Sequence, residues 1–215
     1  IIPSSQLDNM LVVKSPALEY PADFSGGFIL VNTKDVPSSN LFTISVGTSL
    51  NDQTHLKKIL YNKGSGTDFL GFDNGFCSLK GGINVVLSPM NNGYDLLNNG
   101  LNNDWTVKDR RPLADLSLNM NFSRRWVDSS GRTLAILGTV NYSNSYRTYL
   151  DMDNNLFGAY DMTHDCSNYL RKSIDDQYNH SVRIGTMLNF TYIPASGNSR
   201  YEFKNIFNQL GKDRY

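Results

Sequence analysis

Two short stretches of the chain carry side chains that could hold a metal ion. The stretch "DMDNN" at 151–155 has carboxylates at the spacing of a calcium-binding loop. Such a loop needs glycine at its sixth position and glutamate at its twelfth, where this chain has Leu156 and Met162. His164 and Cys166 form an HxC pair without the further ligands of a zinc site. We therefore expect no metal site and no cofactor.

Catalytic and phosphate-binding patterns are equally incomplete. The chain has 3 histidines and no nucleophile elbow from which a Ser/His/Asp set could be built. The stretch "NKGSGTD" at 62–68 has glycines but not the GxxxxGK[ST] pattern of a phosphate-binding loop. Cys77 and Cys166 are far apart and lack CxxC spacing, which leaves one long-range disulfide open. An enzyme is therefore the weakest functional class.

The amino-acid composition argues against a nucleic-acid-binding protein and against a transmembrane helix. The chain has 215 residues, with 20 basic and 20 acidic side chains, so no net charge attracts nucleic acid. Only 40% of the residues are hydrophobic, and no apolar run reaches the roughly 18 residues of a transmembrane helix. The first ten residues lack the basic start and cleavage site of a signal peptide, so we expect the sequence to be a fragment.

The dominant periodicity in the chain is two, the periodicity of a β-strand with one apolar face. Five runs show it, each of about 9 to 13 residues, longer than the usual soluble strand of about 5 to 6. About 9 to 11 tilted residues cross a bilayer, so the lengths favour a membrane barrel. The apolar positions of the runs are Phe42 to Leu50, Leu116 to Trp126, Leu134 to Tyr142, Val182 to Tyr192, and Tyr201 to Phe207.

The connections between these runs differ sharply in length. "VDSSGR" and "PASGNS" are short and rich in turn-forming residues, whereas residues 51–114 and 147–180 form long connections. Outer-membrane barrels have short periplasmic turns and long extracellular loops. Trp126 and Tyr192 lie beside the short turns, where they suit a membrane interface. The opposite faces carry Asn119, Asn121, Asn141 and Asn189, which we expect to face water inside the barrel.

The segment "LDNMLVVKSPALEYPADFSGGFILVNTKD" resembles the end of the plug domain of TonB-dependent outer-membrane receptors. In that family a strand, here Met10 to Lys14, leads through a proline-containing loop to a glycine pair and a last plug strand. The matching residues here are the turn residues Asp23, Gly26 and Gly27, and the strand from Phe28 to Lys34. Glycine suits a sharp turn against a barrel wall because it has no Cβ.

The resemblance continues through the first barrel strands of the family, in "GTDFLGFDNG", "NNDW", "NYSNSY", "DDQYNHSVRIG" and "YEFKNIFNQLG". The chain departs from the family after "GFDNG", where "FCSLKGG" replaces an Arg- and Pro-containing stretch. The resemblance implies an all-β fold: residues 1–37 as the end of the plug, and residues 38–215 as about five strands of a barrel of roughly 22 strands. Residues 51–114 and 147–180 would be extracellular loops.

The implied parent protein lies in the bacterial outer membrane and takes up a scarce nutrient, such as an iron chelate or an oligosaccharide. Its implied partners are the TonB complex, the nutrient, outer-membrane lipid and, over the loops, a surface lipoprotein. Aromatic rings stack on sugars and chelates, so the expected ligand contacts within the loops are Trp105, Tyr149, Tyr160 and Tyr169.

Two other classes remain as alternatives. A secreted, soluble β-sandwich that binds glycans would bury the apolar strand faces against one another and would need no detergent. A surface adhesin or structural β protein would lack a plug-like segment, and "DFSGG" argues against it.

Overall fold

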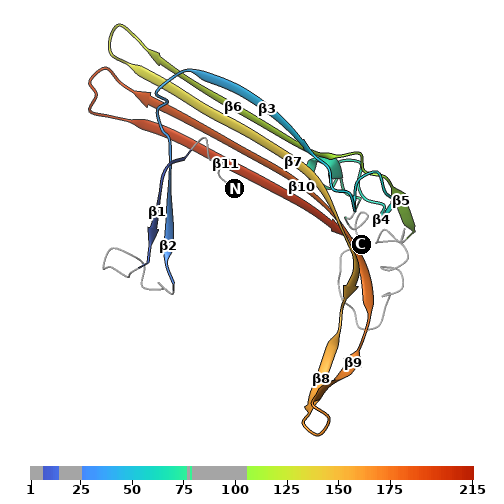
Figure 1. The fold of residues 1–215 in the computed structure, drawn as a ribbon. Helices are drawn as coiled ribbons and strands as arrows, with labels where there is room; N and C mark the ends of the chain where they lie inside the picture. Colours follow the sequence, from blue (N-terminus) through green and yellow to red (C-terminus); the bar gives the residue numbers. More distant parts are fainter. Residues whose placement is uncertain (1–6, 15–25, 77, 79–105) are drawn as a thin grey trace, which may run out of the picture. The chain divides into compact units, whose positions relative to one another are not determined.

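The computed structural model describes residues 7–14, 26–76, 78 and 106–215 (Figure 1). The regular structure of the described residues is β, apart from one short 3₁₀ turn, η2 (Asp68–Leu70), which confirms the all-β prediction. Within the described ranges, no helix has the length and apolar character needed to cross a membrane. The strands are β1 (Leu7–Val13), β2 (Phe28–Thr33), β3 (Leu41–Ser49), β4 (Ile59–Asn62), β5 (Val107–Arg110), β6 (Asp115–Val127), β7 (Thr133–Asp153), β8 (Leu156–Asp161), β9 (Cys166–Arg171), β10 (Ile174–Ile193) and β11 (Tyr201–Arg214).

Five of these strands form one antiparallel sheet in the order β11-β10-β7-β6-β3, and it is the largest sheet of the described residues (Figure 1). The five predicted alternating runs lie in these five strands. The sheet does not close on itself: β3 and β11 are its outer strands. Three two-stranded sheets, β1-β2, β4-β5 and β8-β9, complete the described structure.

The two short connections form tight turns, as the sequence predicts. In the turn between β6 and β7, Gly131 has a φ of 81° and donates its backbone N–H to the Asp128 carbonyl at 2.9 Å. In the turn between β10 and β11, Gly197 has a φ of 67° and donates to the Pro194 carbonyl at 3.0 Å. Positive φ at these places suits glycine, which has no Cβ to clash with the backbone.

The two long connections contain more strand than the sequence indicates. β7 continues to Asp153 and β10 begins at Ile174, and the β8-β9 hairpin lies between them. The β4-β5 hairpin and η2 lie within 51–114. Backbone pairing maintains the extensions where side chains no longer alternate. Tyr178 and Tyr215, for example, exchange two backbone hydrogen bonds of 2.9 Å.

The β1-β2 hairpin matches the predicted strands at 10–14 and 28–34 to within a few residues. The strands are antiparallel, with Met10 opposite Val31. Gly27 has a φ of 150°, and a Cβ there would lie 3.0 Å from the Val13 carbonyl oxygen, so this position requires glycine. A Cβ at Gly26 would meet nothing within 4 Å. The third predicted turn residue, Asp23, lies outside the described residues.

The chain divides into two compact units, which are considered separately below. The first comprises Ile1–Gly47, Ser117–Tyr142 and Ile184–Gln209. Its buried apolar side chains include Ala135, Leu137 and Met187. The second comprises Thr48–Leu116, Ser143–Arg183 and Leu210–Tyr215, and buries Ile59 and Val182.

Candidate functional site

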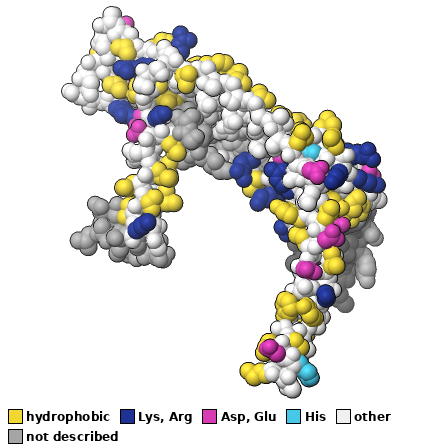
Figure 2. All heavy atoms as spheres, in the orientation of Figure 1, with side chains coloured by type: hydrophobic (Ala, Val, Ile, Leu, Met, Phe, Trp, Pro, Cys, Tyr) yellow, Lys and Arg dark blue, Asp and Glu magenta, His cyan; other side chains and the backbone are white. Residues whose placement is uncertain are grey.

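An exposed apolar face runs along the strands of the first unit. The face includes parts of β6, β7 and β10, which are 13, 21 and 20 residues long, more than the roughly 9 to 11 residues that span a bilayer. Large apolar side chains on this face remain open to solvent, and yellow side chains along the upper margin of the sheet are visible in Figure 2. Among them are Phe42, Ile44, Val46, Phe122, Trp126, Val140, Leu188, Phe190, Tyr201, Phe203 and Phe207, with exposed fractions from 37% to 69%.

The opposite face of the same strands is covered by the segment that joins β2 to β3. The Asn189 side chain donates to the Lys34 carbonyl at 3.1 Å, and the Thr191 hydroxyl donates to the Asp35 carbonyl at 3.0 Å. Asn189 and Thr191 are therefore almost fully buried. The expectation that Asn189 faces water is wrong, because the segment covers its side chain and excludes solvent. Its Nδ2 is paired with the segment, whereas its buried Oδ1 has no hydrogen-bond partner among the described residues. Asn121 also bonds within the protein, accepting from the Thr139 hydroxyl at 3.0 Å.

Asp35 fastens this segment to β11 through charge. Its carboxylate accepts from Lys204 Nζ at 2.5 Å and forms an ion pair with Arg200. Partial burial raises the pKa of Asp35, but the hydrogen bonds and charges of Lys204 and Arg200 outweigh burial and lower the pKa below its ordinary value. The ionised form of Asp35 therefore stabilises the folded chain.

We expect Asp35→Asn to destabilise the chain at neutral pH by less than about 1 kcal/mol, because the ion pairs are solvent-accessible. The folded-state pKa lies below the unfolded value of about 3.9, so the stabilisation is complete above about pH 5 and disappears as the pH falls through the folded-state pKa. Urea unfolding of both proteins between pH 2 and 7 measures this difference. A gap that stayed constant across that range would contradict the assignment.

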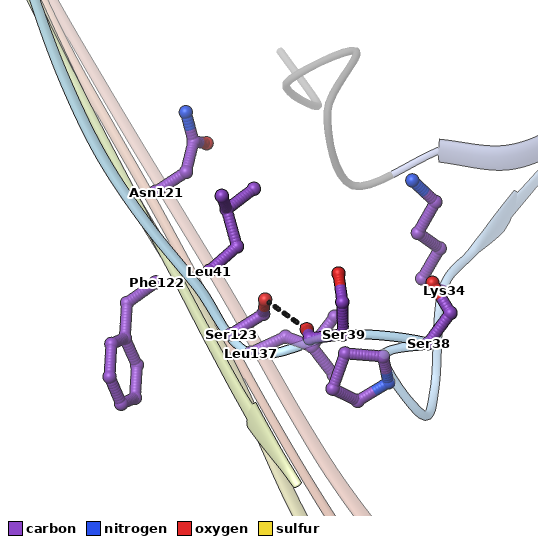
Figure 3. A pocket seen from close by; sticks show the side chains of 9 residues that line it. Lys34, Ser38, Ser39, Leu41, Asn121, Phe122, Ser123 and Leu137 are labelled. Carbon is purple, nitrogen blue, oxygen red and sulfur yellow. Dashed lines mark hydrogen bonds between the residues drawn. The ribbon is translucent and has the colours of Figure 1, made fainter.

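A small cavity of about 100 Å³ lies where the segment meets the sheet. Figure 3 shows that the Leu41 side chain lies on the segment's side, whereas Phe122 points away from it. The Ser123 hydroxyl donates to the Ser39 carbonyl at 3.1 Å, which ties β6 to the segment (Figure 3). The cavity is lined by both polar and apolar side chains and is too small for a drug-sized ligand. We therefore treat it as a packing defect of the covering segment.

In the second unit, the carboxylate of Asp115 binds four donors where β6 begins. Its Oδ2 accepts from Ser49 Oγ at 2.9 Å and from Arg147 Nη1 at 2.6 Å. Its Oδ1 accepts from the Tyr146 backbone N–H at 2.8 Å and pairs with His55 Nε2 at 3.0 Å. Asp115 is 7% exposed, so these partners replace the water that the carboxylate loses on burial.

The hydrogen bonds of His55 define its tautomer. Its Nδ1 accepts the backbone N–H of Asn51 at 2.7 Å, so the ring proton lies on Nε2, which donates to Asp115. The neighbouring Thr54 is fully buried, and its Oγ1 accepts the Thr148 backbone N–H at 3.0 Å. The start of the predicted loop 51–114 is thus fixed to β6 and β7.

The four predicted ligand contacts do not assemble into one site in the described structure. Trp105 lies outside the described residues. Tyr149 lies on β7, while Tyr160 and Tyr169 lie on β8 and β9, where they are about half exposed. The Tyr160 hydroxyl bonds to Asp165, and the Tyr169 ring packs 4.9 Å from the ring of Phe157. Hydrophobic side chains follow this hairpin along its length (Figure 2).

His164 and Cys166, the HxC pair of the sequence, lie at the end of the β8-β9 hairpin. His164 Nδ1 pairs with Asp161 Oδ2 at 2.7 Å, and Cys166 is a free, exposed thiol. The predicted alternative of a disulfide involves Cys77, which lies outside the described residues. In the part of the chain that the structure describes, no cluster of three or more His, Cys, Asp or Glu side chains is arranged to hold a metal ion.

A pocket of about 670 Å³ in the second unit is bounded by a ladder of stacked planar groups. The Arg110 guanidinium lies 4.6 Å from the centre of the Tyr61 ring and 4.7 Å from that of Tyr146. The His180 ring stacks on Tyr146, with centroids 4.4 Å apart and planes within 5°. The ladder connects β4, β5, β7 and β10. Cation–π contacts of this kind contribute about 0.5 to 2 kcal/mol each.

The sequence interpretation missed Asp115, Asp35 and Arg110. Their partners are distant in sequence: His55 lies 60 residues from Asp115, and Lys204 lies 169 residues from Asp35. No local spacing encodes such pairs.

Comparison of the chain with protein-family models, with curated proteins and with solved structures gives no match.

Proposed function

We propose that the chain is the end of the plug domain and the first five barrel strands of a TonB-dependent outer-membrane receptor. The observation that carries the proposal is the exposed apolar face of the five-stranded sheet, whose strands β6, β7 and β10 are long enough to cross a bilayer. A soluble sheet would bury such a face against a second layer. In a lipid bilayer, an apolar face can remain uncovered by protein without a cost in free energy.

The segment 34–39 supports the same proposal. It follows the β1-β2 hairpin and lies on the face opposite the apolar one, bonded to Asn189 and Thr191. A plug domain joined to the inside of a barrel wall requires a connection in this place. Five strands are too few to close a membrane barrel, which needs at least about 8, so further strands of the parent would pair with β3 and β11.

The proposed parent lies in the bacterial outer membrane. It binds a nutrient, an iron chelate or an oligosaccharide, at its extracellular loops, and energy from the TonB complex moves the plug to admit it. The two predicted extracellular loops are 51–114 and 147–180, the regions that hold the β4-β5 and β8-β9 hairpins. A surface lipoprotein would cover these loops.

The proposal is tested by folding the chain in three media: plain buffer, detergent micelles and lipid vesicles. Size exclusion and far-ultraviolet circular dichroism report its oligomeric state and β content. We expect β structure and a single size in micelles or vesicles, and aggregation in buffer through the apolar face and the free strand edges. A monodisperse β protein in plain buffer would overturn the proposal in favour of a soluble glycan-binding sandwich.

A further inference from the structure

The pocket bounded by the ladder of stacked groups is lined by Arg110, which lies against two aromatic rings. The rings of Tyr61 and Tyr146 both contact the guanidinium, whose N–H groups donate hydrogen bonds in its own plane. Its Nε is buried and has no hydrogen-bond partner among the described residues. A buried donor without a partner costs about 1 to 3 kcal/mol. Because Nε has almost no solvent-accessible surface, a ligand in the pocket would instead accept from the terminal Nη groups, which are not among the buried unpaired atoms.

The walls of the pocket supply both signs of charge around Arg110. Burial and the like charges of Asp73 and Asp213 raise the pKa of Asp68, against the opposing effects of the Ser65 backbone hydrogen bond and the Arg110 charge. An anion at Arg110 is therefore attracted by the guanidinium and repelled by Asp68. The other charged or titratable groups on the pocket walls are Lys63, His180 and Lys212.

We propose that this pocket binds a carboxylate, from an acidic sugar or from a carboxylate-bearing chelate, through the edge of the Arg110 guanidinium. Arginine and carboxylate form paired, parallel hydrogen bonds in one plane, which suits the two terminal Nη groups of Arg110. The pocket has room for a ligand larger than the carboxylate itself. Identification of the bound molecule with the transported nutrient rests on the proposed function, whereas carboxylate binding rests on the pocket alone.

The experiment measures binding of digalacturonate and of citrate by isothermal titration calorimetry, with neutral galactobiose as the reference sugar. The full chain is used in whichever medium, buffer or micelles, gives a β-sheet spectrum. We expect at least one acid to bind and galactobiose to bind at least tenfold more weakly. Preference for digalacturonate indicates an acidic sugar as the source of the carboxylate, and preference for citrate indicates a chelate.

Substitutions with opposite expected effects assign the binding to Arg110. Arg110→Gln should weaken binding of the acid at least tenfold, and Arg110→Lys should weaken it less, because lysine keeps the charge but not the planar fork. Asp68→Asn should tighten binding about twofold to fivefold by removing a repelling charge. Lys108→Gln removes an exposed charge from the same strand, outside the pocket lining, and should leave binding unchanged.

The outcomes separate this proposal from the proposed function. A chain that folds only in micelles yet binds neither acid overturns the carboxylate site and leaves the receptor proposal standing. A chain that folds in buffer and loses acid binding in Arg110→Gln supports the site and overturns the receptor proposal. Equal binding by Arg110→Gln, Arg110→Lys and the unaltered chain overturns the site. A chain without a β-sheet spectrum in either medium contradicts the fold on which both depend.

Discussion

Leu188→Arg is expected to destabilise the chain in lipid vesicles by about 2 to 4 kcal/mol, the cost of an arginine on the lipid face near the bilayer midplane. Leu188 lies within the 184–193 stretch of β10, with 46% of its surface exposed. In water, a charged side chain at a position this open would change stability by only about 0.5 kcal/mol. Urea titration of vesicle-inserted chains, followed by tryptophan fluorescence, measures the difference.

The matched control is Leu170→Arg on β9. Leu170 is 70% exposed and lies outside the apolar strand stretches, so the same substitution should cost little in vesicles. Equal costs at Leu188 and Leu170 would argue against contact between β10 and lipid. A large cost of Leu188→Arg in plain buffer, in a monodisperse protein, would show that another protein layer covers this face.

Asp115→Asn is expected to reduce the free energy of unfolding by about 2 to 3 kcal/mol. The carboxylate accepts four hydrogen bonds, and an amide can replace neither its charge toward Arg147 nor both acceptors. Since Arg147 is 46% exposed at its side chain, water compensates part of the loss. Hydrogen exchange should accelerate at the Asn51 amide, because its acceptor, His55, is held by Asp115.

The control for Asp115 is Asp109→Asn on β5. Asp109 pairs with Lys58 at 3.6 Å, but both side chains are more than half exposed, so the expected cost is at most about 1 kcal/mol. Similar losses from the two substitutions would mean that burial and convergence of donors at Asp115 contribute nothing. Unchanged exchange at Asn51 would show that the loop start is fixed by other contacts.

The strands that the sequence predicts best are those whose two faces meet different surroundings. β6 alternates in residue type from Leu116 to Phe122, and the first part of β7 alternates in burial, because one face is apolar and more exposed while the other is polar or covered. The later part of β7 and the early part of β10 lack this contrast. Backbone bonds hold them, as between the Asn154 amide and the Ser173 carbonyl at 2.8 Å, and backbone pairing leaves no trace in side-chain type.

The residues of the candidate site are harder to predict from the sequence than the strands, for a related reason. The sequence predicts Tyr149, Tyr160 and Tyr169 as ligand contacts because they are aromatic residues in long connections. Residue type does not reveal which aromatic rings contact a charged side chain. Arg110 matters because Tyr61 and Tyr146 lie against it from two other strands. At Gly27, in contrast, the requirement for glycine arises from its own backbone angle and a neighbouring strand, which a glycine pair before an alternating run can signal in the sequence.

The attachment of residues 34–39 has a mechanical consequence. Bonds at Lys34, Asp35 and Ser39 follow one another along the segment, from the end next to β2 toward β3. A force applied at β2 and directed away from the sheet would load these bonds in sequence, so each breaks alone at low force. A force along the strand direction would load them together. The segment would therefore peel readily and resist shear, and its release would leave the backbone ladder of the sheet intact.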